Sequence, residues 1–446
     1  MLALGLFLAL APLSLALFLV GGMAVALISL LHPPVALLLL IFSVPFGLMR
    51  EIAWGRARLG APEALLALAL AAWFAQGAIR RRLDVHAGPL AWPFGLFAWA
   101  VALSTLVAVS FQEAIPEVIK WLEVLALYLM ARSVLGPRWV PWLLAAALAA
   151  GTIQGLLGVY QFVRQVGPEA FRLGRYLRAF GTFAQPNPYA GYLGMVVPLG
   201  FSLSWWALGA AWRERERLRT IARLLGYGVA TVICAAGLIM SWSRGAWLGF
   251  TAASLVVIMA QSGRSRLVLI SLVLVGAMMG LLGGFGLLPG ALAARLSDLG
   301  SFVSLPNLNA VEVTEANYSV YERVAHWYAG LAMFSDHPWL GVGAGNFAVF
   351  YPDYAPARWQ VSLGHAHNIF INTAAETGLM GLLAFMVAWG MALIVAVRRV
   401  QTSAGYARAV AVGVLGVLVH VSVHNLFDNL FVQRMYLHLA LLLALI

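Results

Sequence analysis

Apolar runs long enough to cross a membrane recur along almost the whole chain of 446 residues. A helix needs about 20 predominantly apolar residues to span the hydrocarbon core of a bilayer. Only 10% of the residues are charged, against about 25% in typical soluble domains. We therefore predict an all-α polytopic membrane protein with about 12–14 transmembrane helices. The expected spans are 3–30, 35–49, 62–79, 89–110, 115–134, 139–163, 189–211, 222–242, 246–262, 267–289, 369–396, 407–425 and 430–446.

Arginine placement orients these spans, because the cytoplasmic loops of membrane proteins carry an excess of Lys and Arg. The net charge of +11 is therefore interpreted as topology information, and nucleic-acid binding is not expected. The loop at 50–58 is an exception, because it is also basic but alternation places it on the outer side. Short basic loops that alternation places on one side, taken as the cytoplasm, are 80–82, 213–219, 264–266 and 398–408.

The predicted topology divides the chain into three parts. Residues 1–289 hold N-terminal transmembrane helices and a smaller outer loop at 164–188. Residues 290–368 form one large, partly helical outer loop, and residues 369–446 form the C-terminal transmembrane helices.

Metal and disulfide chemistry find little support in the composition. The single cysteine, Cys234, excludes an intrachain disulfide and a thiolate metal cluster. Glu322, Asp336 and Asp353 are scattered along the outer loop, without the acidic pair at ligand spacing that a hard cation requires. We predict no metal site and no cofactor.

Arg244 is the only charge between residues 224 and 260, in the segment SWSRGAWLGF. The run is too long for one helix, and it predicts two helices joined by a tight turn at Arg244-Gly245. A charge at this depth costs about 2.5–3.5 kcal/mol unless it faces a polar cavity. Arg244 either snorkels to the outer interface or binds an anion, and the neighbouring Ser241 and Ser243 favour the second alternative.

The outer loop contains an amphipathic segment, YERVAHWYAGLAMFSDHPWLG. Its periodicity predicts a helix from about Tyr318 to Phe334, with Arg323, His326 and Trp327 on neighbouring faces. The alternative is a loop helix that lies on the membrane with interfacial Trp and Tyr.

The stretch GHAHNIFINTAAETGLMG begins a predicted span with unusual polarity. Asn368, Asn372 and Glu376 follow one another at intervals of four, so they form one stripe on a helix. Asn368 can cap that helix, which places His367, with His365 nearby, at its N-terminus. A helix N-terminus disfavours a charged imidazole, so we predict that His367 is a neutral base; a hydrogen-bonded structural histidine is the alternative.

Two further patterns accompany this stretch. Gly378 and Gly381 lie three residues apart, a spacing that allows another helix to approach closely. In RYLRAFGTFAQPNPYAGYL, Arg178 precedes a Pro-Asn-Pro turn that leads into a helix, although such punctuation is also common in ordinary loops.

Together these segments resemble the O-antigen ligase and polymerase superfamily over roughly residues 175–400. The ligase pattern of this family is His-Asn, nine residues, then Gly-x-x-Gly, and His367-Asn368, residues 369–377 and Gly378 to Gly381 meet it. The resemblance implies a GT-C-like glycosyltransferase of the bacterial inner membrane, with its active site facing the periplasm. Its donor would be a glycan linked to undecaprenyl diphosphate.

The resemblance also implies residue roles. His367 takes the position of the catalytic histidine, and Arg244 and Arg323 take those of the arginines that bind the lipid diphosphate, with Arg178 as a third cation. Possible accessory residues are His365, Asn368, Glu376 and His326. The pattern favours metal-independent, inverting, ligase-type transfer. Aromatic faces bury the C–H surfaces of sugars, so we expect the outer loop to supply a sugar-facing wall made of Trp327, Tyr328, Trp339 and Trp359.

The acceptor is left open by the resemblance, since a glycan, a lipid A-core and a protein are all used within the family. A polymerase and a protein O-oligosaccharyltransferase therefore remain alternatives. A lipid-linked glycan transporter is less favoured, because the polar residues cluster at the outer face rather than at the bilayer midplane.

Overall fold

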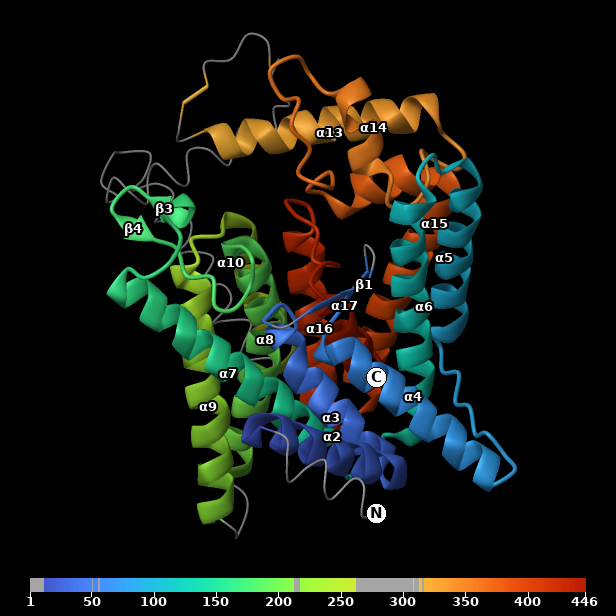
Figure 1. The fold of residues 1–446 in the computed structure, drawn as a ribbon. Coiled ribbons are helices and arrows are strands. Elements are labelled where there is room, and N and C mark those ends of the chain that lie inside the picture. Colours follow the sequence, from blue (N-terminus) through green and yellow to red (C-terminus); the bar gives the residue numbers. More distant parts are fainter. Residues whose placement is uncertain are drawn as a thin grey trace.

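The computed structural model describes residues 12–49, 51–54, 57–211, 217–261, 308, 313–314 and 317–446. These residues fold almost entirely into helices (Figure 1), as the all-α prediction requires. The protein is therefore a multi-pass membrane protein of helical type. Six helices are long and apolar enough to cross a membrane: α4 (Ala61–Ile79), α7 (Val140–Arg164), α8 (Pro186–Ala211), α9 (Arg217–Met240), α15 (Ile369–Thr402) and α16 (Gly405–His424).

Shorter elements complete the described part of the chain. The last predicted span, 430–446, contains only the nine-residue helix α17. The predicted span 267–289, much of the loop 290–368 and several basic residues of the predicted cytoplasmic loops lie outside the described residues, so the helix count and the domain boundaries stay predictions. The remaining helices are α2 (Leu13–Leu31), α3 (Pro33–Ser43), α5 (Ala91–Ser104), α6 (Phe111–Val134), α10 (Arg244–Gln261), α13 (Tyr318–Asp336), α14 (Phe347–Tyr354) and α17 (Met435–Leu443). Two antiparallel hairpins pair β1 (Ile52–Trp54) with β2 (Ala57–Leu59) and β3 (Arg172–Leu173) with β4 (Tyr176–Leu177).

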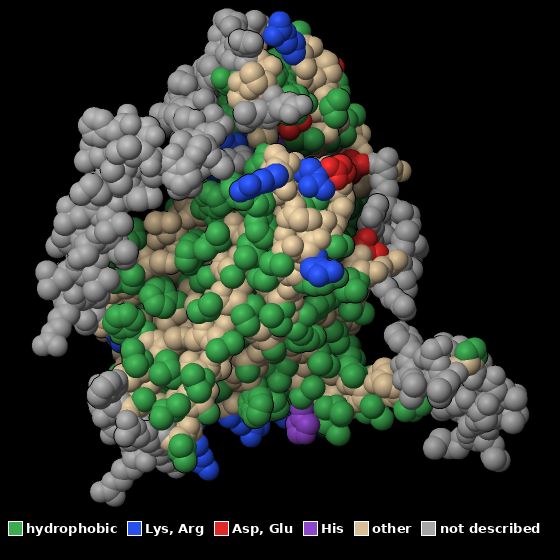
Figure 2. Space-filling model, turned by 90° about the vertical axis from the view of Figure 1, so that its left-hand side faces the viewer, with side chains coloured by type: hydrophobic (Ala, Val, Ile, Leu, Met, Phe, Trp, Pro, Cys, Tyr) green, Lys and Arg blue, Asp and Glu red, His purple; other side chains and the backbone are tan. Residues whose placement is uncertain are grey.

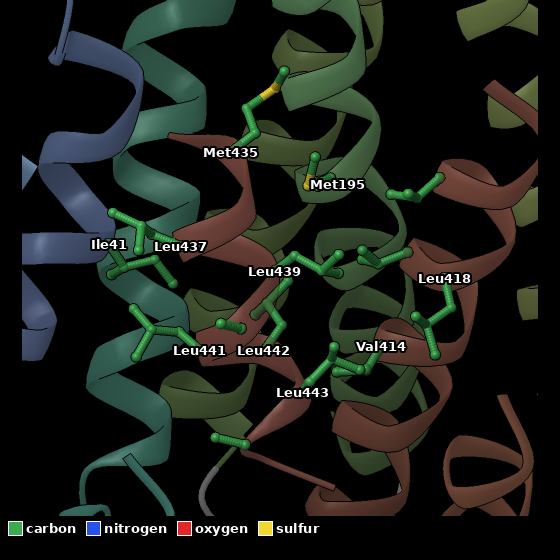
Figure 3. Close-up of a cluster of buried hydrophobic side chains, with 14 of the residues drawn as sticks. Ile41, Met195, Val414, Leu418, Met435, Leu437, Leu439, Leu441, Leu442 and Leu443 are labelled. Atoms are coloured by element: carbon green, nitrogen blue, oxygen red, sulfur yellow. The ribbon is translucent and has the colours of Figure 1, made fainter. Parts of the chain in front are cut away.

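The buried core is centred on α8 and α16, which pack against each other and against α10. Small residues let these helices approach closely: a Cβ on Gly413 would lie 3.0 Å from the Cα of Leu199. The short helix α17 fills the space between this group and α3. Its leucines interdigitate with Ile41, Met195 and Val414 (Figure 3).

The outer surface matches a membrane environment. Hydrophobic side chains cover most of the face shown in Figure 2, whereas charged side chains gather toward its upper part and along its lower edge. Large apolar side chains such as Leu106, 74% exposed, and Val232, 68% exposed, would be unfavourable in water. Lipid contact explains their exposure.

The amphipathic helix α13 lies across one end of the helical bundle, at the top of Figure 1. It runs from Tyr318 to Asp336, close to the predicted bounds. It packs against α15 and the short helix α14, so it is part of a folded cap over the bundle.

Gly378 interrupts α15 with a positive φ of 63°. A Cβ there would come within 2.3 Å of the backbone of Trp339, and the amide of Leu379 donates to the carbonyl of Pro338 at 2.7 Å. The prediction that Gly378 admits a neighbouring helix is therefore wrong, because the close partner is the turn after α13. The turn after α13 packs against this break in α15.

Candidate active site

A cavity of about 280 Å³ collects the three arginines that the sequence singled out, Arg178, Arg244 and Arg323. It lies between the β3–β4 hairpin, the start of α10, α13 and the loop after α16. Residues more than 140 positions apart in the sequence thus form one positively charged pocket. Its lining residues are Ala170, Arg172, Leu173, Arg178, Asn187, Trp242, Ser243, Arg244, Gly245, Leu248, Tyr318, Ser319, Arg323, His424, Phe427 and Asp428.

Arg178 is held in a fixed orientation by two hydrogen bonds. Its Nε donates to the carbonyl of Ser241 at 2.7 Å, and its Nη2 donates to Oδ1 of Asn187 at 2.8 Å. Asn187 is the middle residue of the Pro-Asn-Pro turn at the start of α8. The role of that turn in placing Arg178 was missed from the sequence, although the segment itself was singled out.

The segment that follows β4 and carries Arg178 is held in place by the buried side chain of Gln161. Gly181 has a φ of +58°, and Gln161 accepts its amide hydrogen and donates to its carbonyl, each at 2.8 Å. A Cβ at Gly181 would collide with Gln154 at 2.3 Å. Glycine is therefore required where the chain turns back toward the cavity.

Arg244 and Arg323 meet at Ser319 of α13. Arg244 donates from Nη2 to the Ser319 hydroxyl at 3.3 Å, and Arg323 donates from Nη1 to the Ser319 carbonyl at 2.8 Å. Nε of Arg323 is buried without a hydrogen-bond partner among the described residues. An unsatisfied buried donor is costly, so this atom is available for an anionic ligand.

The aromatic lining differs from the expected one. Trp327 and Trp359, anticipated as part of a sugar-facing wall, are only 8% and 6% exposed and pack inside the cap. The aromatic residues that line the cavity are Trp242, Tyr318 and Phe427. Trp327 is buried where α13 packs against Ile371 of α15, and Trp359 packs against Val324 and Ala325 of α13.

His367 lies beside the cavity and contacts it through Asp428. Its Nδ1 is 3.2 Å from Oδ1 of Asp428, so the proton of a neutral ring resides on Nδ1 and Nε2 carries the lone pair. Nε2 is buried and has no partner among the described residues. His367 has a φ of +51°, and its carbonyl accepts a hydrogen bond from Nε1 of Trp327 at 3.4 Å.

Asp428 was missed by the sequence reasoning. It follows α16, lines the cavity, and is the only acidic residue of the chain after Glu376, which is the signal that could have found it. Burial alone would raise its pKa, but the hydrogen bond from His367 and the positive charge of Arg323 outweigh this and hold the pKa of Asp428 below its usual value. Asp428 is therefore a carboxylate at neutral pH.

The two other predicted histidines differ in their bonding. Nδ1 of His365 accepts the backbone amide of His367 at 3.1 Å, and desolvation lowers the pKa of His365 to about 3. His326 uses both ring nitrogens: Nδ1 donates to the carbonyl of Glu322 at 2.7 Å, and Nε2 accepts the amide of Leu363 at 3.1 Å. Burial lowers the pKa of His326 to about 4, so it is a neutral ring that holds the segment before His367.

The polar stripe at the start of α15 anchors backbone segments. Asn368 is the N-cap, accepting the amides of Phe370 and Ile371 at 3.0 and 3.2 Å, which confirms the predicted capping role. Asn372 accepts the amide of Ala366 at 2.9 Å.

Glu376 lies apart from the arginine cavity. It accepts the amide of Phe347 at 3.3 Å and lines a separate small cavity with Glu117 and Lys120. The structure therefore does not bring Glu376 together with the three arginines. Its observed contact is with the backbone at the start of α14.

One group of side chains has the composition of a metal site. The ligand atoms of His365, His367 and Asp428 all lie within 4.8 Å of one another. Imidazole nitrogens and a carboxylate oxygen are ligands that Zn²⁺ accepts. Glu322, Asp336 and Asp353 take no part in such a group within the described part of the chain.

Residues 229–386 match the family model described as O-antigen ligase. This match confirms the family recognised from the sequence motifs. It includes Arg244, Arg323 and His367, whereas Arg178 and Asp428 lie outside it. No curated protein matches the chain closely enough to count as a relative.

Proposed function

We propose that the protein transfers a glycan from undecaprenyl diphosphate to an acceptor hydroxyl, because residues 229–386 match the O-antigen ligase family. The reaction is a metal-independent, inverting transfer of the ligase type. The observation that carries this proposal is the cavity in which Arg178, Arg244 and Arg323 converge beside the His367–Asp428 pair.

The arginines stabilise the leaving group. A glycosyl diphosphate departs with its negative charge on the diphosphate oxygens, and guanidinium groups neutralise such charge through short, directional hydrogen bonds. Ser319 and Asn187 hold the guanidinium groups in place before the donor arrives. This preorganisation supports a role in the transition state, since little rearrangement is needed during the reaction.

His367 activates the acceptor. Its Nε2 takes the proton of the acceptor hydroxyl while the hydroxyl oxygen attacks the anomeric carbon and the bond from that carbon to the diphosphate oxygen breaks. Asp428 accepts the Nδ1 hydrogen bond, which orients the ring, selects the neutral tautomer with its lone pair on Nε2 and stabilises the imidazolium that forms. General-base catalysis of this kind contributes roughly 10²–10⁴-fold.

The membrane placement follows from the same scheme. The protein would lie in a bacterial inner membrane with the cavity and the cap formed by α13 on the periplasmic side. The polyprenol chain would lie in the bilayer against the apolar surface of the helices. The acceptor, whether a glycan, a lipid A-core or a protein, would approach from the cap side.

The test uses purified protein in detergent with a defined undecaprenyl-diphosphate oligosaccharide. Transfer to an added acceptor supports a ligase, and elongation of the donor without an acceptor indicates a polymerase. His367→Ala should abolish transfer while donor binding persists, and His337→Ala, which removes an exposed histidine of the cap, should retain activity. Near-normal turnover of His367→Ala would exclude the proposed base.

The metal-independent form of the mechanism has its own test. Activity should survive EDTA, and added Zn²⁺ should inhibit if it occupies the group of His365, His367 and Asp428. Loss of activity in EDTA that Mg²⁺ or Mn²⁺ restores would refute the metal-free scheme.

A further inference from the structure

A second cavity has a volume of about 250 Å³. The helix ends that line it lie at the end of the molecule opposite α13 (Figure 1). It forms where the break between α2 and α3, the C-terminus of α4 and the turn between α6 and α7 come together. Its lining residues are Leu31, His32, Pro33, Pro34, Trp73, Gln76, Gly77, Arg80, Arg82, Leu83, Asp84, Ser133, Val134, Arg138 and Trp139.

Local backbone geometry builds this cavity. Arg81 adopts a φ of +51°, and the amide of Arg82 donates to the carbonyl of Gly77 at 2.9 Å, a helix-ending turn that folds residues 82–84 back toward α4. Gln76 donates to the carbonyls of Leu30 and Leu31 at 2.8 and 3.1 Å. The side chain of Gln76 thus ties α4 to the C-terminal end of α2.

The charge in this cavity is mainly positive. Arg82 is paired with Asp84 at 2.6 Å. Arg80 and Arg138 have no acidic partner within the described residues, and Arg138 lies 5.7 Å from the centre of the Trp139 ring. Two guanidinium groups therefore remain to attract an anion.

Exposed apolar residues adjoin these cations. Ile79 is 82% exposed, Leu31 71% and Phe74 55%, and contact with lipid hydrocarbon would remove this apolar area from water. Lysine or arginine and histidine side chains also lie along the lower edge of the hydrophobic surface in Figure 2. Trp73 and Trp139 line the same cavity, and tryptophan prefers the depth of lipid headgroups.

We propose that this cavity binds the phosphate group of an anionic phospholipid, with the acyl chains lying against Leu31, Phe74 and Ile79. Basic pockets between transmembrane helices bind lipid phosphates through charge and hydrogen bonds. The ligand joins an anion to apolar chains, and the protein places unpaired guanidinium groups directly beside exposed apolar side chains. A water-soluble anion would leave that apolar surface unused.

The experiment measures lipid binding to the full-length protein in detergent, by native mass spectrometry and thermal shift. Phosphatidylglycerol should bind and raise the melting temperature, whereas phosphatidylcholine should do so far less. The double variant Arg80→Gln/Arg138→Gln should bind phosphatidylglycerol about tenfold more weakly. The control Arg398→Gln removes an exposed arginine that does not line this cavity, and it should bind normally.

A separate arm identifies the source of the phosphate. If inorganic phosphate alone stabilises the wild type and the double variant loses this effect, the cavity is a phosphate site whose ligand is the free ion. If phosphatidylglycerol binds and inorganic phosphate does not reproduce the effect, the ligand is the lipid. Equal phosphatidylglycerol binding by the wild type and the double variant, or equal binding of both lipids, would overturn the proposal. None of these measurements depends on glycosyl transfer.

Discussion

Asp428 has two effects on the candidate active site: its shape positions neighbouring groups, and its negative charge lies beside His367. The substitution Asp428→Asn separates these two effects. The substitution preserves shape, and the amide oxygen can still accept the backbone amide of Asn429, which lies 2.9 Å from Oδ1 in the structure. Only the negative charge beside His367 is removed. In the proposed mechanism, the imidazolium that forms on His367 during proton transfer then lacks its counter-ion.

The magnitude follows from the 3.2 Å separation of His367 Nδ1 and Asp428 Oδ1. Two unit charges at that distance interact by about 5 kcal/mol at an effective dielectric constant of about 20. A measured charge-assisted hydrogen bond contributes about 1.5–3 kcal/mol. We expect a loss of about 3 kcal/mol in the transition state, which lowers kcat by roughly 10²-fold.

Donor binding should change in the opposite direction. Asp428 lines the cavity that holds the three arginines, so removing its charge strengthens the attraction of a diphosphate. Initial rates with a synthetic lipid-linked donor give kcat, and titration with undecaprenyl diphosphate gives the affinity. Asp353→Asn, an exposed cap residue, is the control. Unchanged kcat, or a donor that binds more weakly to Asp428→Asn, would refute this reasoning.

Three further predictions concern the cap and the cavity. Arg323→Gln should raise the KM for the donor by about 10-fold or more, because charge-assisted hydrogen bonds to the diphosphate are lost. The control Arg358→Gln changes an exposed cap residue and should leave KM unchanged, and equal KM values for the two variants would exclude Arg323 from donor binding. Gly378→Ala should lower thermal stability strongly because its φ is +63° and a Cβ would lie 2.3 Å from backbone, whereas Gly390→Ala, with nothing within 4 Å of the added Cβ, should not. Burial lowers the pKa of His326 from 6.5 to about 4 on folding, so its contribution to the free energy of unfolding is complete above pH 6.5 and is lost as the pH falls toward 4. By pH 5 the loss is about 2 kcal/mol. Chemical denaturation of His326→Gln should therefore show a correspondingly weaker dependence on pH.

Local signals in the sequence predicted a large part of the architecture. Apolar length identified the described spans, and the spacing of side chains identified α13 and the cap at Asn368, because these depend on neighbours within a few residues. The three arginines were singled out because charge is rare in this chain and because the motifs resemble those of a known family, and they line one cavity in the structure.

Long-range contacts could not be predicted in this way. Asp428 pairs with His367 across 61 positions, and no local pattern connects them. Trp327 was expected to face sugar because an amphipathic helix does not reveal which partner will cover its aromatic side. Gly378 was assigned to helix packing because a sequence cannot show that a glycine has a positive φ.

The arginine cavity encloses about 280 Å³, at the lower limit of the roughly 300–1,000 Å³ typical of small-molecule pockets. Such a volume admits a diphosphate and the sugar joined to it, but it leaves the remaining sugars of a long chain outside. Selectivity would then depend on the first sugar and its linkage. The number of repeats could vary freely, so one protein of this design would serve short and long polysaccharides alike.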